Sequence, residues 1–260
     1  MTRKIKLLFL FLALSLCAVA RDEYSRVFDN TISVQSGQRL MLEHSLGDIE
    51  IHTHASPELI VHADIRVSAS DASEAKSFAD NIAILVEPSS SQISVRTRYP
   101  ERPQSFFGTR NVSYTVRYDI TTPESLPLEV RSSFGAVSVN GVKAGCDIKA
   151  SHGDLSFRDG RGTQHLANSF ASVHVSNNTG DVTVESGNGA VNASGIRGAF
   201  SVRNRFGAVN VSEVTNGAKI VNNNGSVDLA NSSGPSSIDN SFGAVNVSNV
   251  KGDLAVNNAN

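Results

Sequence analysis

The chain has 260 residues and a formal net charge of −2, so it lacks the surplus of basic residues that nucleic-acid binding requires. Hydrophobic residues make up 40% of the chain and charged residues 18%, which excludes an intrinsically disordered protein and leaves enough apolar material for a sizeable core. Twenty glycines and an aromatic fraction of only 6% favour thin, turn-rich β-structure over a wide enzyme cleft.

Residues 1–20 have the layout of a secretory signal peptide. A basic start over 3–6 precedes an apolar run over 7–16, and this run is too short to cross a bilayer comfortably. Small residues at both ends of 18–20 predict cleavage after Ala20. No later apolar stretch reaches the spanning length, so we expect an exported protein that resides in the periplasm, on the outer surface or outside the cell.

The two cysteines bear on whether the exported chain carries a lipid anchor and whether it can form a disulfide. Acylation of Cys17 is an alternative to simple cleavage, although Leu16 stands where lipoprotein processing normally needs a small residue. Cleavage after Ala20 leaves Cys146 as the one remaining cysteine, which excludes an intrachain disulfide. Stability must then come from packing and backbone hydrogen bonds.

Residues 21–131 form an N-terminal region that we expect to be β-rich and to cap a repeat array. This region holds six of the seven prolines but only three of the 22 asparagines, so the composition changes near residue 131. Apolar and polar residues alternate in several stretches, for example over 59–67, as they do in half-buried strands. Asp71 and Glu74 have the spacing of a capping box, which predicts one short helix that ends at about residue 80.

The N-terminal region also contains the candidate metal ligands. Glu50, His52 and His54 share the outward face of one predicted strand. If the next strand folds back directly against it, His52 lies opposite His62 and Asp64 lies near Glu50, which would place imidazoles and carboxylates within ligand distance. The alternative is an ordinary polar face in contact with solvent. We therefore expect no metal, no other cofactor and no catalytic residue, with His52, His54 and His62 as the metal candidates to examine.

Residues 132–260 contain seven copies of an 18-residue motif without insertion or deletion. Its most visible members are the phenylalanines of SFGAVxV segments, which recur every 36 residues at Phe134, Phe170, Phe206 and Phe242. Weaker copies such as HGDLSF and NGSVDL lie halfway between them. LGDIEI, within the N-terminal region, resembles the same motif. Repetition at a fixed period predicts a solenoid-like array.

Each copy has two short alternating stretches, so it predicts two strands separated by turns. One column is nearly all asparagine, with Ser132 and Ser186 in the same register. Its asparagines are Asn168, Asn204, Asn222, Asn240 and Asn258. Stacked about 4.8 Å apart they could form an amide ladder, which requires parallel strands in register. We therefore predict an all-β protein with a parallel β-solenoid, or β-helix, whose coil holds either 18 residues or, as the double repeat, 36.

The motifs together resemble a known family. The N-terminal region contains ISVRTRYP over 93–100 and VSYTVRYDITTP over 112–123, and tandem SFGAVxV and GDLxV segments follow. With the signal peptide, this combination is similar to the bacterial adhesin-like proteins that carry tandem β-strand repeats. The resemblance spans essentially the whole mature chain and implies a cell-envelope or surface protein of a Gram-negative bacterium. It supplies no catalytic residues.

Three functions follow from these observations. The first is a non-enzymatic surface protein whose repeat faces bind a glycan or an envelope protein in the manner of an adhesin. The second is a periplasmic scaffold or envelope-stress component, whose open C-terminal edge docks a partner strand or a second copy of the chain. The third is a polysaccharide-acting enzyme, although the acidic residues of the repeats fall in scattered columns rather than as a facing pair.

Overall fold

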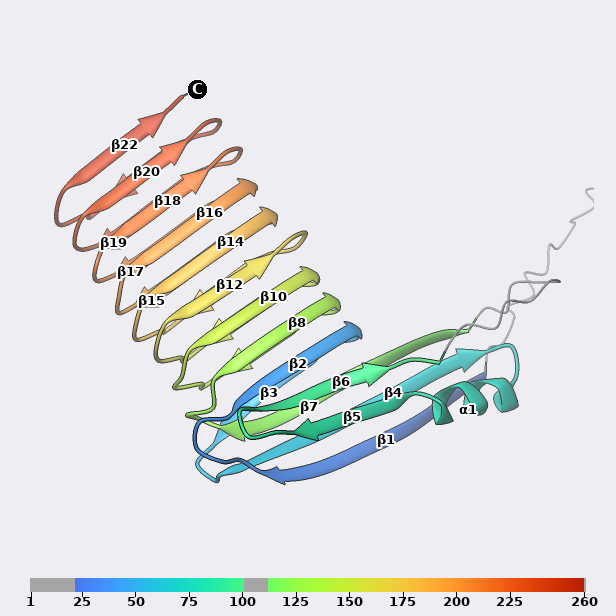
Figure 1. Cartoon of the computed structure of the whole chain (residues 1–260). Coiled ribbons are helices and arrows are strands. Elements are labelled where there is room, and N and C mark those ends of the chain that lie inside the picture. The colour runs from blue at the N-terminus through green and yellow to red at the C-terminus, as the bar shows by residue number, and fades with distance from the viewer. Residues whose placement is uncertain (1–21, 101–111, 260) are drawn as a thin grey trace, which may run out of the picture.

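The computed structural model describes residues 22–100 and 112–259, so the predicted signal peptide and Cys17 lie outside the described residues. In the described part, one helix and 22 strands are arranged as two sheets of 11 strands each, here called sheet A and sheet B. Figure 1 shows most of the strands stacked along one axis, with longer strands and the helix gathered at one end. The predicted all-β fold, a parallel β-solenoid with an irregular N-terminal β-region, is confirmed.

In spatial order, sheet A consists of β1 (Asp22–Ser33), β4 (Glu58–Ala69), β7 (Ser113–Pro123), β3 (Ile49–His54), β9 (Val137–Asn140), β11 (Leu155–Arg158), β13 (Val173–Ser176), β15 (Val191–Ile196), β17 (Val209–Val214), β19 (Val227–Ser232) and β21 (Val245–Ser248). Sheet B consists of β5 (Ala83–Pro88), β6 (Gln92–Arg98), β2 (Arg39–Leu46), β8 (Leu128–Phe134), β10 (Cys146–His152), β12 (Gln164–Asn168), β14 (Val182–Asn188), β16 (Phe200–Phe206), β18 (Ala218–Asn222), β20 (Ser236–Asn240) and β22 (Leu254–Asn258).

The register of the parallel strands fixes the coil at 18 residues. Leu155 of β11 pairs with Val137 on one side and with Val173 on the other, each 18 positions away. The same offset holds in sheet B, where Ile220 pairs with Val202 and Ile238. Each rung of the solenoid therefore contains one strand of each sheet, and the 36-residue spacing of the phenylalanines is two rungs.

The solenoid begins earlier in the chain than the tandem repeats do. Leu40 of β2 pairs with Leu128 of β8, and Ile49 of β3 pairs with Val137 of β9, both in parallel. The LGDIEI segment is thus the corner of a complete rung. After His54 the chain leaves this rung to build the N-terminal end, and it returns to the solenoid with β8.

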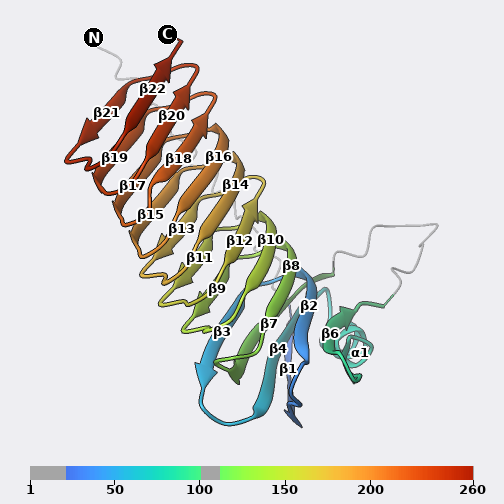
Figure 2. The same ribbon diagram turned by 60° about the vertical axis from the view of Figure 1, so that its left-hand side comes forward.

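The N-terminal end extends both sheets with strands of mixed direction. β6 and β7 continue sheets B and A in parallel, and β5, β4 and β1 add to them antiparallel. Helix α1 (Ala72–Asp80) packs against β1 and β4, with Ala75 and Ala79 buried. Its N-cap Asp71 accepts a hydrogen bond of 2.8 Å from the Glu74 amide, so the predicted helix start is confirmed. Figure 2 shows the two sheets as facing layers with α1 at this end.

The core lies between the two sheets and consists mainly of aliphatic side chains. Positions alternate between buried and outward along each strand, so one buried column is continuous from rung to rung. Its members Val137, Leu155, Val173 and Val191 are fully buried. At the far end of sheet B, by contrast, the inward positions of β22 are exposed, and Leu254 is 43% exposed. No helix among the described residues is both long and apolar enough to cross a membrane.

Candidate functional site

The buried asparagine column lies at the corner where sheet B turns into sheet A. Asn222 is 1% exposed, and its Nδ2 donates to the carbonyl oxygen of Gly225 at 3.0 Å and to Oδ1 of Asn240 at 3.2 Å. Its own Oδ1 accepts from Nδ2 of Asn204 at 3.1 Å. Asn240 repeats the pattern toward Asn258 at 3.2 Å. Each amide therefore joins its own turn to the next rung.

The first predicted member of this column lies apart from the other four. Ser186 separates Asn168 from Asn204, and Asn168 donates instead to the carbonyl oxygens of Gly153 and Ser172, at 3.0 and 3.3 Å. In the earliest rung the column is occupied by His44, a position that the sequence analysis did not connect with it. Burial lowers the pKa of His44 to about 4, so the imidazole is neutral at pH 7.

The strand pairing on which the metal candidates depend does not occur. β4 does not fold back against β3, because β7 lies between them in sheet A. His52 consequently lies opposite Thr121, and His62 lies opposite Asp119 and Asp29. A long excursion of the chain supplies β7, so the local turn at Ser56-Pro57 does not decide which strands pair.

The three candidate histidines have separate environments. His52 Nε2 is 3.9 Å from Glu50 Oε2, and Glu50 also pairs with Arg117 at 2.6 Å. His54 Nε2 is within 2.7 Å of the carbonyl oxygen of Glu58. His62 Nδ1 is 2.7 Å from Asp29 Oδ1, and this hydrogen bond raises the pKa of His62. Across the described ranges, no three His, Cys, Asp or Glu side chains lie close enough to hold a metal ion.

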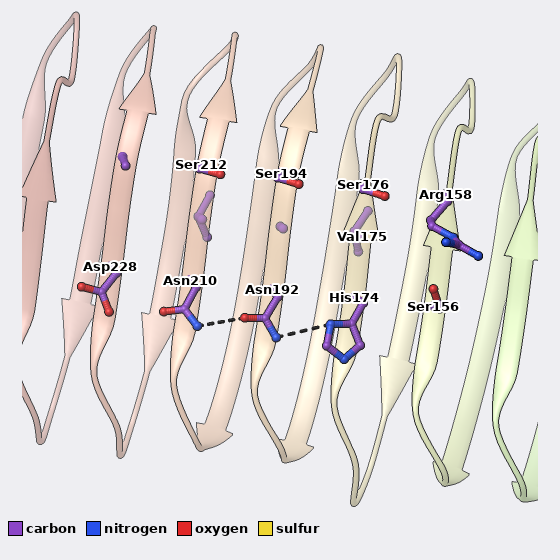
Figure 3. Close-up of a pocket in the computed structure, with 13 residues that line it drawn as sticks. Ser156, Arg158, His174, Val175, Ser176, Asn192, Ser194, Asn210, Ser212 and Asp228 are labelled. Carbon is purple, nitrogen blue, oxygen red and sulfur yellow. Dashed lines mark hydrogen bonds between the residues drawn. The ribbon is translucent and has the colours of Figure 1, made fainter.

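The outward face of sheet A carries a shallow open groove across the middle of the solenoid, here called the face groove (Figure 3). Its volume is about 460 Å³, and it lies over the strands that carry Val175, Ala193 and Val211, whose side chains are buried in the core behind it. Two outward columns form its surface. The first contains Ser156, His174, Asn192, Asn210 and Asp228, and the second contains Arg158, Ser176, Ser194, Ser212 and Ala230.

Hydrogen bonds between rungs hold the first column of the face groove in place. Nδ2 of Asn210 donates to Oδ1 of Asn192 at 2.9 Å, and the Asn192 amide is 3.4 Å from Nδ1 of His174 (Figure 3). Below Asp228, the Asn246 amide donates to its carboxylate at 2.8 Å. These side chains are therefore ordered before any ligand arrives, and successive rungs present polar groups about 4.8 Å apart.

A second open groove lies on the outside of sheet B at the corner next to the asparagine column, and we call it the rim groove. Its volume is about 700 Å³. Its charged and aromatic lining consists of Phe170, Glu185, Arg203 and Arg205, and Asn188 lies among them. Sequence reasoning missed this groove, because it assigned the phenylalanines to the repeat pattern without placing them in or out of the core.

The phenylalanines of the repeats point outward at this corner. Phe134, Phe170, Phe206 and Phe242 are between 48% and 60% exposed, which is unusual for four large aromatic side chains in one column. The ring of His152 stacks between two of them, with centroid distances of 4.6 Å to both Phe134 and Phe170. The sequence shows that these phenylalanines recur every 36 residues, but this spacing does not indicate whether their rings are buried or exposed.

Comparison with known proteins gives structural similarity only. No protein-family model and no curated protein matches the sequence. Among solved structures, a "putative adhesin" from Bacteroides fragilis is 16% identical, with a TM-score of 0.35 over 90% of this chain and 97% of that one. A "putative cell adhesion protein" from Clostridium sporogenes is 12% identical, with a TM-score of 0.26 over 92% and 100%.

A third solved structure, a "putative lipid binding protein" from Parabacteroides distasonis, is 11% identical, with a TM-score of 0.28 over 90% of this chain and 97% of that one. Two further structures from Parabacteroides species also carry the description "putative adhesin". Four of these five solved structures are thus bacterial proteins described as putative adhesins or a putative cell adhesion protein.

Proposed function

We propose that this chain is an exported, non-enzymatic surface protein that binds a glycan along the outer face of sheet A. The observation that carries the proposal is the face groove, in which every rung presents an outward polar side chain and hydrogen bonds order the amides of Asn192 and Asn210. A glycan is itself a repeating chain of hydroxyl groups that donate and accept hydrogen bonds. A rod with repeated contacts can hold such a chain through many individually weak interactions. Export is supported by the layout of residues 1–20.

The charge of the face groove favours a neutral glycan. Arg158 and Asp228 are its two oppositely charged side chains, so they leave no net charge when His174 is neutral. The side chains of Asn192 and Asn210 each offer both a donor and an acceptor, as do the serine hydroxyls.

The same groove supports binding rather than hydrolysis. Glycoside hydrolysis normally needs two carboxyl groups that face each other across the scissile bond. Among the lining residues of the face groove, Asp228 is the one carboxylate, and its oxygen accepts the amide of Asn246. The proposed protein therefore holds its ligand without cleaving it.

The test is binding of neutral hexasaccharides to the mature chain and to a face variant. We expect at least one of cellohexaose, chitohexaose and mannohexaose to bind, and we expect the triple variant His174→Ala/Asn192→Ala/Asn210→Ala to weaken that binding by about tenfold or more, because several hydrogen bonds are lost together. Isothermal titration calorimetry measures the dissociation constant, and thermal unfolding verifies that the variant remains folded.

The matched control removes outward side chains from the opposite sheet. Thr183 and Ser201 face outward from β14 and β16, so Thr183→Ala/Ser201→Ala should leave the affinity unchanged. The proposal is contradicted if the triple variant binds as tightly as the wild-type chain, or if the wild-type chain binds none of the three hexasaccharides.

A further inference from the structure

The outward corner column on sheet B, here called the ring column, has a phenylalanine in every second rung and a histidine or an asparagine in the rungs between. From β8 onward it contains Phe134, His152, Phe170, Asn188, Phe206, Asn224 and Phe242. The first three rings form a continuous stack, because His152 is nearly parallel to both neighbours, at 18° and 17°. One ring therefore fills one rung of this column.

At the next rung the column holds an amide in place of a ring. Asn188 is paired with Phe206, and its Nδ2 donates to the carbonyl oxygen of Ser169 in the preceding turn, at 3.3 Å. Phe170 and Phe206 are therefore two rungs apart, or roughly 9.6 Å, with no ring between them. This gap opens into the rim groove, which Phe170, Asn188 and Arg205 line together. His152 shows that a ring of suitable thickness fits between two phenylalanines of this column.

The charge around the gap selects among the rings that could enter it. Two arginines and one glutamate line the rim groove, which leaves one net positive charge. No carboxylate in the described ranges lies within ion-pair distance of Arg203 or Arg205, although Glu185 is the strand partner of Arg203. Both arginine side chains are exposed, so their guanidinium groups can bind a carboxylate in bidentate fashion.

We propose that the gap at Asn188 binds a uronic-acid residue of an acidic polysaccharide. The pyranose ring lies between Phe170 and Phe206 and stacks its C–H faces on the two aromatic rings. Its carboxylate pairs with Arg203 or Arg205, and its hydroxyls reach the amides of Asn188 and Asn223 at the edge of the groove. The inference rests on the proposed function in that the ligand is a glycan, but it assigns a second ligand class to a separate face.

The second gap of the ring column supplies an internal control. Asn224 also separates two phenylalanines by two rungs, Phe206 and Phe242. Arg203 and Arg205 lie on β16, between the two gaps, but the rim groove that they line includes Phe170 and Asn188 and neither Asn224 nor Phe242. On its far side the second gap is bordered by Asp239, whose charge opposes an acidic sugar. We expect this gap to contribute little to the binding of an acidic sugar.

The direct test fills the gap with a ring from the protein itself. Asn188→Phe should extend the stack as His152 does, keep the thermal stability of the chain, and weaken binding of hexagalacturonate by about tenfold or more. Asn224→Phe makes the same change in the second gap and should retain the affinity of the wild-type chain. Calorimetry with hexagalacturonate and with its methyl ester, at low and high salt, measures these effects.

A second variant tests the charge without altering the rings. Arg203→Gln/Arg205→Gln should also weaken binding of hexagalacturonate by about tenfold and remove most of its salt dependence. The methyl ester should bind the wild-type chain about as weakly as hexagalacturonate binds the arginine variant, because the esterified carboxyl group carries no charge.

The outcomes separate this inference from the proposed function. The triple variant of the face groove should bind hexagalacturonate as the wild-type chain does, whereas Asn188→Phe should bind the neutral hexasaccharides normally. The inference is overturned if the wild-type chain does not bind hexagalacturonate, if the methyl ester binds equally well, or if Asn188→Phe or the arginine variant keeps full affinity. None of these results alters the expectation for the face groove.

Discussion

Replacing Gly225 by alanine should lower the free energy of unfolding by about 4 kcal/mol, because a Cβ has no room between two rungs. The backbone of Gly225 has a φ of +137°, a conformation that residues with a side chain rarely adopt. A Cβ built there would overlap the carbonyl oxygen of Gly207 and lie 2.5 Å from its carbonyl carbon. These atoms belong to the backbone of the neighbouring rung, which cannot move aside without disturbing the pairing of the strands.

Gly37→Ala is the matched control, since Gly37 also has a positive φ, of +86°, but has nothing within 4 Å of its Cβ position. Gly37→Ala should lower the free energy of unfolding only by the cost of the backbone strain, about 1 to 2 kcal/mol. Urea denaturation followed by circular dichroism compares the two variants. An equal loss of stability in both would show that the rungs are not in close contact at Gly225.

Replacing Asn222 by leucine should destabilise the chain by about 3 kcal/mol, because three hydrogen bonds at a buried corner are lost together. The carbonyl oxygen of Gly225 and Oδ1 of Asn240 lose a donor, and Nδ2 of Asn204 loses one of its two acceptors. Leucine has a similar size, so the loss of stability reports mainly the polar contacts.

Asn223→Leu provides the comparison at the next residue, whose side chain is exposed. It should change the free energy of unfolding by less than about 0.5 kcal/mol. Hydrogen exchange of the amides in β16, β18 and β20 should also accelerate in Asn222→Leu but not in Asn223→Leu. Similar stability of the two variants would mean that the asparagine column does not hold the corner together.

The repeat half of the fold could be predicted from the sequence because every rung repeats the same positions. Val137, Leu155 and Val173 recur at an 18-residue interval, and stacking them in parallel is the arrangement that buries all of them at once. The sequence did not decide the length of the coil, because the spacing of Phe134 and Phe170 favours a 36-residue coil as strongly as the aliphatic residues favour an 18-residue coil. The strand pairing decides the coil length, since each strand pairs with the strands 18 residues before and after it.

The N-terminal end could not be predicted in the same way because its pairings are distant in sequence. β7 enters sheet A between β3 and β4, so Thr121 and Asp119 occupy the positions that a local hairpin would give to His62 and His52. The helix was predictable, since Asp71 and Glu74 act within one turn. Local patterns thus identified the elements there but not their neighbours.

The candidate surfaces were partly visible in the sequence. Outward positions such as His174, Asn192 and Asn210 follow from strand alternation, and the structure adds the hydrogen bonds that order them. The exposure of Phe170 could not be inferred, because alternation along β12 places it on the inward side. The chain turns at this point, so the ring lies beyond the edge of the core and reaches solvent.

The most direct test of the central claim is the affinity of the mature chain for neutral oligosaccharides of increasing length, taken from the series that binds best. If the face groove binds a glycan along the solenoid axis, the dissociation constant should fall with each added sugar until the ligand spans the strands from β11 to β19, roughly 19 Å. A disaccharide that binds as tightly as a hexasaccharide would instead indicate a single local pocket and contradict binding along the rungs.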